Sequence, residues 1–290
     1  MIDIDFSIYP LTGWFPGHML KAEKAMQDAL KLVDMVVELI DARAPSSSQN
    51  PSFREKLQNK PFITVANKSD LADPAASQRW VDAYAKQGER LFLLDARRTA
   101  AIRGLPKLWR QIILDERARR GATRPLTRPV RIMIVGIPNI GKSTLVNHLH
   151  ERNKAKVGPK PGVTRQNQWI PLPDNVELLD TPGILWPKIE TKRHELLLAL
   201  LGNLKEELVD PVLLADYLAC RLSELPKVKW SVLGLDAPPE SPDQVLQTLA
   251  KRRGLLKQGG VLDLERAANA FIKDYRDGKL GRFTFENPPE

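Results

Sequence analysis

The sequence holds a single cysteine, Cys220, among its 290 residues. That count excludes an internal disulfide framework and any zinc site built from several cysteines, and it fits a reducing compartment. Long apolar runs are equally scarce, since the richest, Leu196 to Leu201, is far too short to cross a bilayer. The N-terminus carries Asp3 and Asp5 and lacks the basic start and apolar core of a secretory signal. We therefore expect a cytoplasmic protein with no membrane partner.

Acidic residues are outnumbered, with 35 aspartates and glutamates against 44 lysines and arginines and a net charge of +9. This surplus is high for an enzyme of small-molecule metabolism and favours an anionic macromolecule as partner, because a basic face attracts a phosphate backbone without reading bases. A DNA partner is not expected. The alternative is a dispersed charge that only keeps the surface soluble. The length allows one large domain and a smaller one.

Glycines are also few, 17 in all, yet two of them frame the most informative stretch. An apolar run at 132–135 leads into a G-x-x-x-x-G-K-S pattern at 136–143, and a helix start follows. In this setting the pattern predicts a phosphate loop, because the glycines let backbone N–H groups converge beside the positive end of the helix. Lys142 would reach the β- and γ-phosphates, and Ser143 would hold Mg²⁺. The alternative is an ordinary glycine-rich turn. The candidate nucleotide-binding residues here are Gly136, Pro138, Asn139, Ile140, Gly141, Lys142, Ser143 and Thr144.

A second motif, Asn67-Lys68-Ser69-Asp70, ends the strand expected at 62–66. An aspartate can accept hydrogen bonds from the ring N–H and the exocyclic amine of guanine, whereas adenine presents an acceptor at the first of these positions. Asp70 would therefore select GTP over ATP, since the wrong base leaves a buried charge unpaired. Lys68 would lay its stem along the base, and Asn67 would tie this loop to the phosphate loop.

A third segment, Asp95-Ala96-Arg97, follows the strand expected at 91–94, beyond a helix expected at 77–86. One strand after the aspartate loop, a GTPase supplies a backbone N–H to the guanine carbonyl oxygen, and Ala96 is the residue in that position. We include Asp95, Ala96 and Arg97 among the nucleotide-binding candidates. Alone, the tripeptide is equally well explained as a strand-end turn.

Two further segments follow the phosphate loop. The composition of 154–165 predicts a mobile loop, in which Thr164 would meet Mg²⁺ and the γ-phosphate. Short strands are expected at 168–172 and 176–179, the second ending in Asp180-Thr181-Pro182-Gly183. Asp180 would hold Mg²⁺ through water, and the Gly183 N–H would sense the γ-phosphate. Ser143, Thr164 and Asp180 form the predicted magnesium set, and Lys142, Thr164 and Gly183 the catalytic set.

In the last third of the chain the apolar residues follow helical spacing, and no further strand pattern is found. Helices are expected at 196–204, at 212–222, from Ser241-Pro242 through Lys251, and from an Asp263 cap to Gly278. An arginine-rich stretch at 115–130 predicts an exposed basic connector. We divide the chain into an α/β domain at 1–187, with a leader at 1–20, and a small helical domain at 188–290. A basic face is expected on the helical domain from Lys251, Arg252, Arg253, Lys257, Arg266, Lys273, Arg276, Lys279 and Arg282.

The guanine loops precede the phosphate loop, the reverse of the common GTPase order. In a doubly wound, mostly parallel sheet all ligand loops lie at the carboxyl ends of the strands, so the order along the chain can rotate while the site stays the same. The fold class we expect is a circularly permuted P-loop GTPase of the α/β class, followed by an all-α domain. Rotation joins the segment after Gly183 to the helical domain, and we hypothesise that γ-phosphate loss moves this joint.

With its permuted order, the chain resembles the ribosome biogenesis GTPase A (YlqF-type) family. The resemblance rests on Trp14-Phe15-Pro16-Gly17-His18-Met19, Asp41-Ala42-Arg43-Ala44-Pro45, the phosphate loop and Asp180-Thr181-Pro182-Gly183-Ile184, and it extends into the helical tail. It implies a GTPase that acts in late assembly of the large (50S) ribosomal subunit and is stimulated by it. It also implies that the helical domain touches ribosomal RNA and that hydrolysis of GTP to GDP drives release.

Ile184 stands where many GTPases have a glutamine that orients the attacking water, and it cannot form that hydrogen bond. Slow intrinsic hydrolysis should follow. The resemblance assigns the water-positioning role to His18. The alternative is a histidine that stabilises the aromatic leader by packing and a backbone hydrogen bond.

Asn139 matches the phosphate-loop asparagine of GTPases that recruit K⁺ near the β- and γ-phosphates, where the cation offsets developing charge. The alternative is that Asn139 only shapes the loop. The cofactors implied are thus Mg²⁺ and, through Asn139, K⁺.

One rival hypothesis is a GTP-regulated RNA-binding switch in which hydrolysis is incidental. A permuted GTPase of the small ribosomal subunit is disfavoured, because it would need an N-terminal OB-like domain and a cysteine-rich zinc module. A nucleotide-dependent metabolic kinase is disfavoured because no second small-molecule site is evident.

Overall fold

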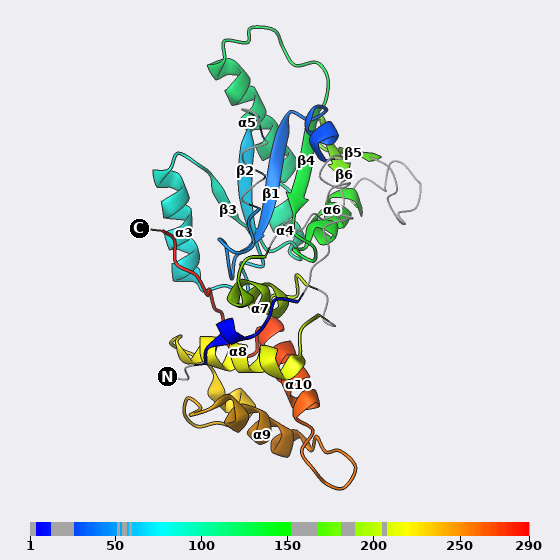
Figure 1. Cartoon of the computed structure of the whole chain (residues 1–290). Coiled ribbons are helices and arrows are strands. Elements are labelled where there is room, and N and C mark those ends of the chain that lie inside the picture. Colours follow the sequence, from blue (N-terminus) through cyan, green and yellow to red (C-terminus); the bar gives the residue numbers. More distant parts are fainter. Residues whose placement is uncertain are drawn as a thin grey trace.

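In the computed structural model, which describes residues 4–12, 26–50, 53, 57, 60–151, 168–180, 189–204 and 208–289, six strands form one sheet in the order β3-β2-β1-β4-β6-β5 (Figure 1). Neighbouring strands are parallel except β5, which runs antiparallel to β6. The mostly parallel sheet predicted from the sequence is confirmed. The strands are β1 (Met35–Asp41), β2 (Phe62–Asn67), β3 (Leu91–Leu93), β4 (Val130–Gly136), β5 (Gln168–Leu172) and β6 (Val176–Asp180).

Helices cover both faces of this sheet. Along β1 the side chains alternate, so that Val37 and Leu39 pack with α5 (Leu105–Arg119) and α6 (Lys142–Glu151) on one face. Val36 packs with the helical residues 26–30 on the other face, where Ile40 joins α3 (Pro74–Lys86). Because both faces are covered, β1 is buried along its whole length. Its sequence is mostly apolar, with Glu38 inside the strand and Asp41 at its end as the charged residues.

The helix α5, after the short α4 (Thr99–Ile102), corrects the expected connector. It extends to Arg119, so the first residues of the stretch 115–130 are helical and not connector. Trp109 and Ile112 bury one side of the helix against the sheet. Near its end Glu116 pairs with Arg119 and Arg120, which lets an arginine-rich segment continue the helix.

After β6, the residues that the structure describes form helices joined by turns and loops. Ser241 accepts a hydrogen bond from the N–H of Gln244, and Asp263 accepts one from the N–H of Arg266, so both predicted N-caps are confirmed. Gly278, the predicted stop of the last helix, has φ +75°. The helices are α7 (Lys192–Leu200), α8 (Pro211–Ser223), α9 (Pro242–Arg253) and α10 (Leu264–Arg276), with a 3-10 turn η3 at Trp230–Leu233.

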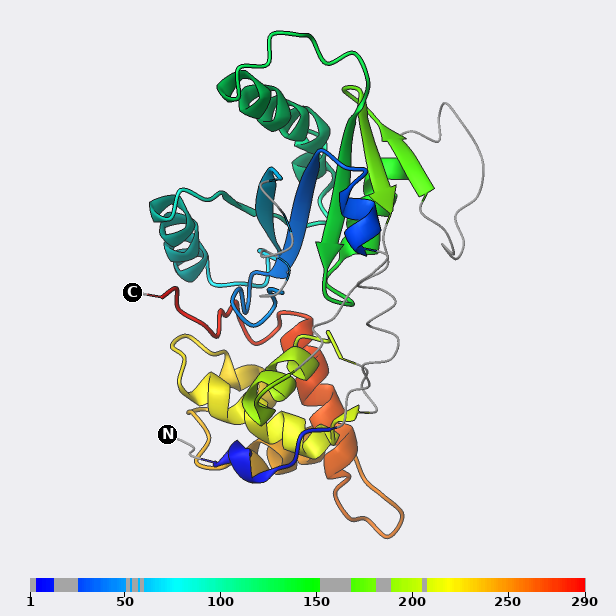
Figure 2. The same ribbon diagram turned by 45° about the horizontal axis from the view of Figure 1, so that its top comes forward.

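Each end of the chain packs on the part of the molecule that is distant from it in the sequence: the N-terminal end on the helical part and the C-terminal end on the α/β part (Figure 2). The leader was assigned to the α/β domain, but its residues 4–12, with the 3-10 turn η1 (Phe6–Ile8), pack on the helical part. There Phe6 meets Tyr217 edge-on at 5.3 Å, and the Thr12 N–H donates to Glu195 Oε1 at 2.9 Å. A C-terminal tail, residues 281–289, returns in the opposite direction to the α/β part. The leader assignment is thus corrected, because an aromatic side chain near the N-terminus finds its core among the helices.

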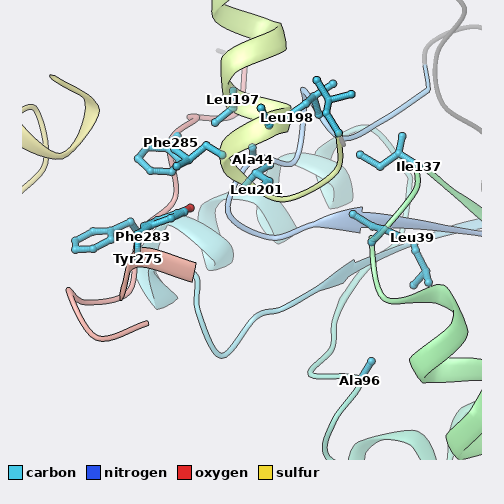
Figure 3. Close-up of a cluster of buried hydrophobic side chains, with 14 of the residues drawn as sticks. Leu39, Ala44, Ala96, Ile137, Leu197, Leu198, Leu201, Tyr275, Phe283 and Phe285 are labelled. Atoms are coloured by element: carbon cyan, nitrogen blue, oxygen red, sulfur yellow. The ribbon is translucent and has the colours of Figure 1, made fainter. Parts of the chain in front are cut away.

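One hydrophobic core runs through both parts (Figure 3). Leu197 and Leu201, at the end of α7, lie beside Ala44 of the loop after β1. Phe283 and Phe285 of the tail are buried in the same cluster. The carboxyl edge of the sheet therefore rests on the helical part.

Candidate functional site

The predicted nucleotide loops meet at the carboxyl edge of the sheet, where β1 and β4 lie side by side. The chain moves outward in one direction from β1 and in the other from β4, which makes this the switch point where doubly wound folds bind ligands. Two neighbouring cavities open there, of about 340 Å³ and about 490 Å³. The first is lined by the guanine loops and the second by the phosphate loop, and they share Asn139, Gly141 and Thr144.

The two glycines of the phosphate loop are required by close approaches. A Cβ on Gly136 would lie 2.7 Å from the carbonyl oxygen of Leu39 on the adjacent strand. A Cβ on Gly141, where φ is +98°, would lie 2.2 Å from Asn67 Nδ2. The backbone of the loop can therefore touch both β1 and the guanine loop only if these positions lack side chains.

Asn67 joins the three loops, as the sequence predicts for its tie to the phosphate loop. Its Nδ2 donates to the carbonyl oxygen of Ile140 at 2.8 Å, and its Oδ1 accepts from the N–H of Ala96 at 2.9 Å. The side chain is buried, so both bonds are shielded from water. The Ala96 N–H, assigned from the sequence to the guanine carbonyl oxygen, is thus engaged by Asn67, and a contact with guanine would have to share it.

Asp70 lies in the base cavity with Arg97, and the two side chains form an ion pair. Arg97 also contacts Asp95, so all three residues predicted here lie together. The second oxygen of Asp70, Oδ1, is buried and has no hydrogen-bond partner among the described residues. A buried acceptor without a partner is suited to the guanine N–H groups that the sequence predicts Asp70 to bind. The positive charge of Arg97 offsets the negative charge of Asp70.

At the wall of the base cavity lies a charge cluster of Asp41, Arg43 and Lys68, in which Asp41 and Arg43 are buried and Lys68 is partly exposed. Arg43 donates from Nε and Nη2 to the Asp41 carboxylate at 2.9 and 2.8 Å, and Lys68 Nζ is 3.1 Å from Asp41 Oδ2. Burial by itself would raise the pKa of Asp41, but the charges of Arg43 and Lys68 hold it well below its usual range. Lys68 has φ +59°, an uncommon conformation that this ion pair helps to hold. The motif Asp41-Ala42-Arg43 thus positions the lysine of the guanine loop.

The phosphate side contains the other predicted residues. Lys142 is buried, while Ser143 and Thr144 are exposed at the first turn of α6 and line the larger cavity. Asp180 ends β6, next to β4, so its backbone lies at the same edge of the sheet. His18, Thr164 and Gly183 lie outside the described residues. Among the described residues no cluster of three or more histidine, cysteine, aspartate or glutamate side chains could hold a metal ion.

Several contacts of this site come from residues that the sequence did not single out for it. His148 Nδ1 lies 2.8 Å from the carbonyl oxygen of Ala96, which links α6 to the third guanine segment. Arg276 of α10 lines the base cavity. The tail reaches the guanine loop, where the N–H of Phe283 donates to the Leu71 carbonyl at 3.0 Å and Arg282 donates to the Ser69 carbonyl at 2.9 Å. None of these contacts has a local sequence signal.

The predicted basic face is largely used inside the molecule. Arg253 and Lys279 pair with buried Asp274, and Lys273 pairs with Asp277. Arginines 252, 276 and 282 donate to backbone carbonyls. The remaining three, Lys251, Lys257 and Arg266, are exposed and form no ion pair within the described part of the chain. Acidic partners therefore offset part of the positive charge of the predicted face.

Comparison with known proteins agrees with this site. Residues 131–221 match the family described as 50S ribosome-binding GTPase. The chain is 40% identical to ribosome biogenesis GTPase A of Priestia megaterium, over 96% of this chain and 97% of that protein. It is 36% identical to mitochondrial ribosome-associated GTPase 1 of Mus musculus, over 94% of this chain and 91% of that one.

A solved structure gives the same result for the fold. The crystal structure of GNP-bound YlqF from T. maritima superposes with a TM-score of 0.68 at 30% identity, covering 93% of this chain and 99% of that chain. In the described part of the chain, no helix is long and apolar enough to span a membrane. With its permuted guanine and phosphate loops joined through Asn67, the chain belongs to the ribosome biogenesis GTPase A family.

Proposed function

We propose that this GTPase acts in the cytoplasm as a late assembly factor of the large ribosomal subunit, binding the subunit through its RNA and hydrolysing GTP to GDP to drive release. The observation that carries the proposal is the Asn67 bridge, which bonds the glycine-rich loop at Ile140 to the segment at Ala96, as a GTP site would require. Relatives named for ribosome biogenesis are matched over nearly the whole chain, and the 50S ribosome-binding family is matched over residues 131–221; both support the large subunit as the partner.

Mg²⁺ would be held by Ser143, Thr164 and Asp180 together with phosphate oxygens. Ser143 fits this role, since its hydroxyl is exposed at the start of α6 and lines the phosphate cavity. The ion would supply positive charge to the β- and γ-phosphate oxygens. Lys142, buried at the base of the same cavity, would add a second positive charge there, and the Gly183 N–H would contact the γ-phosphate.

K⁺ would bind next to Asn139. The backbone of Asn139 is left-handed, with φ +56°, and its Nδ2 donates to the Gly202 carbonyl at 2.9 Å. That bond fixes the orientation of the Asn139 side-chain amide. It uses only the nitrogen, so the amide oxygen, the atom type that ligates K⁺, takes no part in it. Turnover in KCl should exceed turnover in NaCl, and equal rates would leave Asn139 with a loop-shaping role only.

His18 would position the attacking water, because Ile184 cannot. We expect His18→Ala to lower subunit-stimulated turnover while GTP affinity and the thermal midpoint stay unchanged. Unchanged stimulation in this variant would assign His18 to packing in the leader.

The RNA contact would lie near the loop between α9 and α10, which projects from the molecule (Figure 1). Lys251, Lys257 and Arg266 are exposed cations there that form no ion pair among the described residues, and a phosphate backbone would be attracted to them without base reading. Leu256 and Val261, 49% and 64% exposed, lie on the same loop.

The decisive experiment is GTP turnover in KCl with and without purified large subunits, with small subunits as control. Stimulation by the large subunit alone would support the proposal. Slow turnover that responds to neither particle would favour the alternative, an RNA-binding switch in which GTP sets affinity and hydrolysis is incidental.

A further inference from the structure

The turn that ends α7 lies directly on the phosphate loop. Asn203 donates from Nδ2 to the carbonyl oxygen of Pro138 at 2.9 Å, and Asn139 donates from Nδ2 to the carbonyl oxygen of Gly202 at 2.9 Å. Two amide hydrogen bonds therefore cross, in opposite directions, between the helical part and the loop that cradles phosphate. Asn203 is 1% exposed, so its bond to Pro138 is protected from water.

The turn itself is rigidly built. The N–H of Asn203 donates to Leu198 and the N–H of Gly202 donates to Ala199, with Gly202 at φ +80°, which is the pairing of a Schellman motif. The carbonyls that the helix end leaves exposed also have partners, because Arg276 donates to those of Ala199 and Leu200. A displacement of the phosphate loop would therefore be transmitted to α7 and α10 through this turn.

Asparagine is a costly residue at this position. The residue after the glycine of a Schellman motif is commonly apolar and packs back on the helix. Here the side chain is a buried amide whose Oδ1 has no hydrogen-bond partner among the described residues. An unmatched buried acceptor destabilises the folded state, so an apolar side chain would serve helix termination better. The hydrogen bond to the Pro138 carbonyl is the one interaction of this side chain that an apolar residue could not make.

We propose that Asn203 is a positioning residue of the phosphate loop: by holding the Pro138 carbonyl it fixes the loop in the conformation that binds phosphate, and it couples nucleotide binding to the helical part. The positioning role depends on the family's GTP binding and not on the ribosomal partner. Failure of ribosome stimulation would therefore leave it untouched.

The test is Asn203→Leu, which keeps the turn and removes the donor. We expect an unchanged or raised thermal midpoint, a GTP and GDP affinity reduced by about tenfold, and faster amide hydrogen exchange at 137–141 in the nucleotide-free protein. Asn203→Ala, which adds no bulk, is the second variant if the leucine is not accommodated. Asn269→Leu is the matched control, because Asn269 is exposed on α10 and its side chain bonds only within its own helix.

A second readout separates positioning from structure. Adding a non-hydrolysable GTP analogue to the wild-type chain, without denaturant, should slow exchange of those amides in α7 and α10 that exchange by local fluctuation and not by global unfolding. Asn203→Leu should abolish that local response even at saturating nucleotide. Nucleotide affinities within twofold of wild type, with unchanged exchange at 137–141, would overturn the proposal. An intact response of α7 and α10 at saturation would overturn the coupling. A wild-type chain that binds no GTP would instead contradict the family activity itself.

Discussion

Gly141 shows how one position without a side chain joins two loops. The Asn67 amide passes over its Cα to reach the Ile140 carbonyl at 2.8 Å, and an added Cβ would lie 2.2 Å from Nδ2. The spacing of the phosphate-loop glycines predicts an anion cradle, but only the fold shows that the second glycine also admits the guanine loop.

Gly141→Ala should therefore weaken nucleotide binding by more than the loss of a flexible backbone position. We expect Asn67 to be displaced, with about a tenfold loss of GTP affinity, since a broken buried hydrogen bond costs about 1–3 kcal/mol. Titration with a fluorescent GTP analogue measures the loss. Gly121→Ala is the control, because Gly121 also has positive φ, +73°, but no atom within 4 Å of the added Cβ. Equal losses in both variants would assign the effect to backbone strain.

Asp216 of α8 gives a prediction that depends on pH. Burial raises its pKa to about 6, and the charges of Asp243 and Asp210 add to the shift. Its Oδ1 is buried without a partner among the described residues. Because the folded pKa exceeds the ordinary 3.8, the folded state binds this proton more tightly. The stability it contributes is complete below the ordinary value and is lost as the pH rises through about 6.

Asp216→Asn should consequently stabilise the protein at neutral and alkaline pH by about 1 kcal/mol, a figure discounted for the partial exposure of the side chain. The gain should vanish in acid, where the wild-type carboxyl is protonated. Urea unfolding of both proteins across this range measures it. A gain of equal size at every pH would show that packing, not charge, is responsible.

Among single residues, the sequence predicts those whose chemistry is local. Asn67, Lys68, Asp70 and the phosphate-loop residues follow from spacing after a strand. Residues such as Asn203 are distant in sequence from the loops they contact and lie in no such pattern. Their contacts can be recognised only once the position of the helical part relative to the sheet is known.

At the scale of elements, the C-terminal tail is the clearest case of an unpredicted function. Its backbone and side chains bond to the loop after β1, beside the base cavity: the Phe285 N–H donates to the Arg43 carbonyl at 2.7 Å, and Thr284 Oγ1 to the Ala42 carbonyl at 3.2 Å. Glu286 accepts from the N–H groups of Ser46 and Ser47. These two serines of the loop after β1 thus anchor the tail.

Glu286→Ala should loosen this anchor. Hydrogen bonds to a charged group contribute about 1.5–3 kcal/mol, and partial exposure places this case at the lower end, so a lower thermal midpoint is expected. Hydrogen exchange at 42–48 should rise in parallel. Asn287→Ala, which removes only an exposed contact of 3.4 Å to Arg79, should leave both quantities unchanged. A midpoint that falls equally in the two variants would contradict the anchor.

Elements with strong periodicity are predicted well, and the exceptions have physical reasons. The strands and the caps at Ser241 and Asp263 are confirmed, because local chemistry decides them. Helix α5 was missed although Leu105, Trp109 and Ile112 recur at helical spacing, since its arginine-rich end resembled a connector. The charge of the basic face is partly offset, because charge can be counted in a sequence, whereas a partner such as Asp274 cannot be assigned from it.

At the scale of the whole molecule, the two terminal segments hold the α/β part and the helical part together. The N-terminal segment packs on the helical part, and the tail packs on the α/β part, while a single apolar core runs between them. Any reorientation of the helical part during the GTPase cycle must either preserve these ties or break them. The Asn203 and Asn139 bonds lie at the centre of the same junction.

The continuous core predicts that the two parts unfold together. Hydrogen exchange under increasing urea should give β1 and α10 the same free energy of opening, and GTP should raise both by the same amount, because a ligand of the native state stabilises everything that unfolds with its site. Without shared unfolding, GTP would protect only the sheet. A lower opening energy in α10 that does not respond to nucleotide would show that the helical part unfolds alone, and the terminal segments would then act as tethers and not as parts of one core.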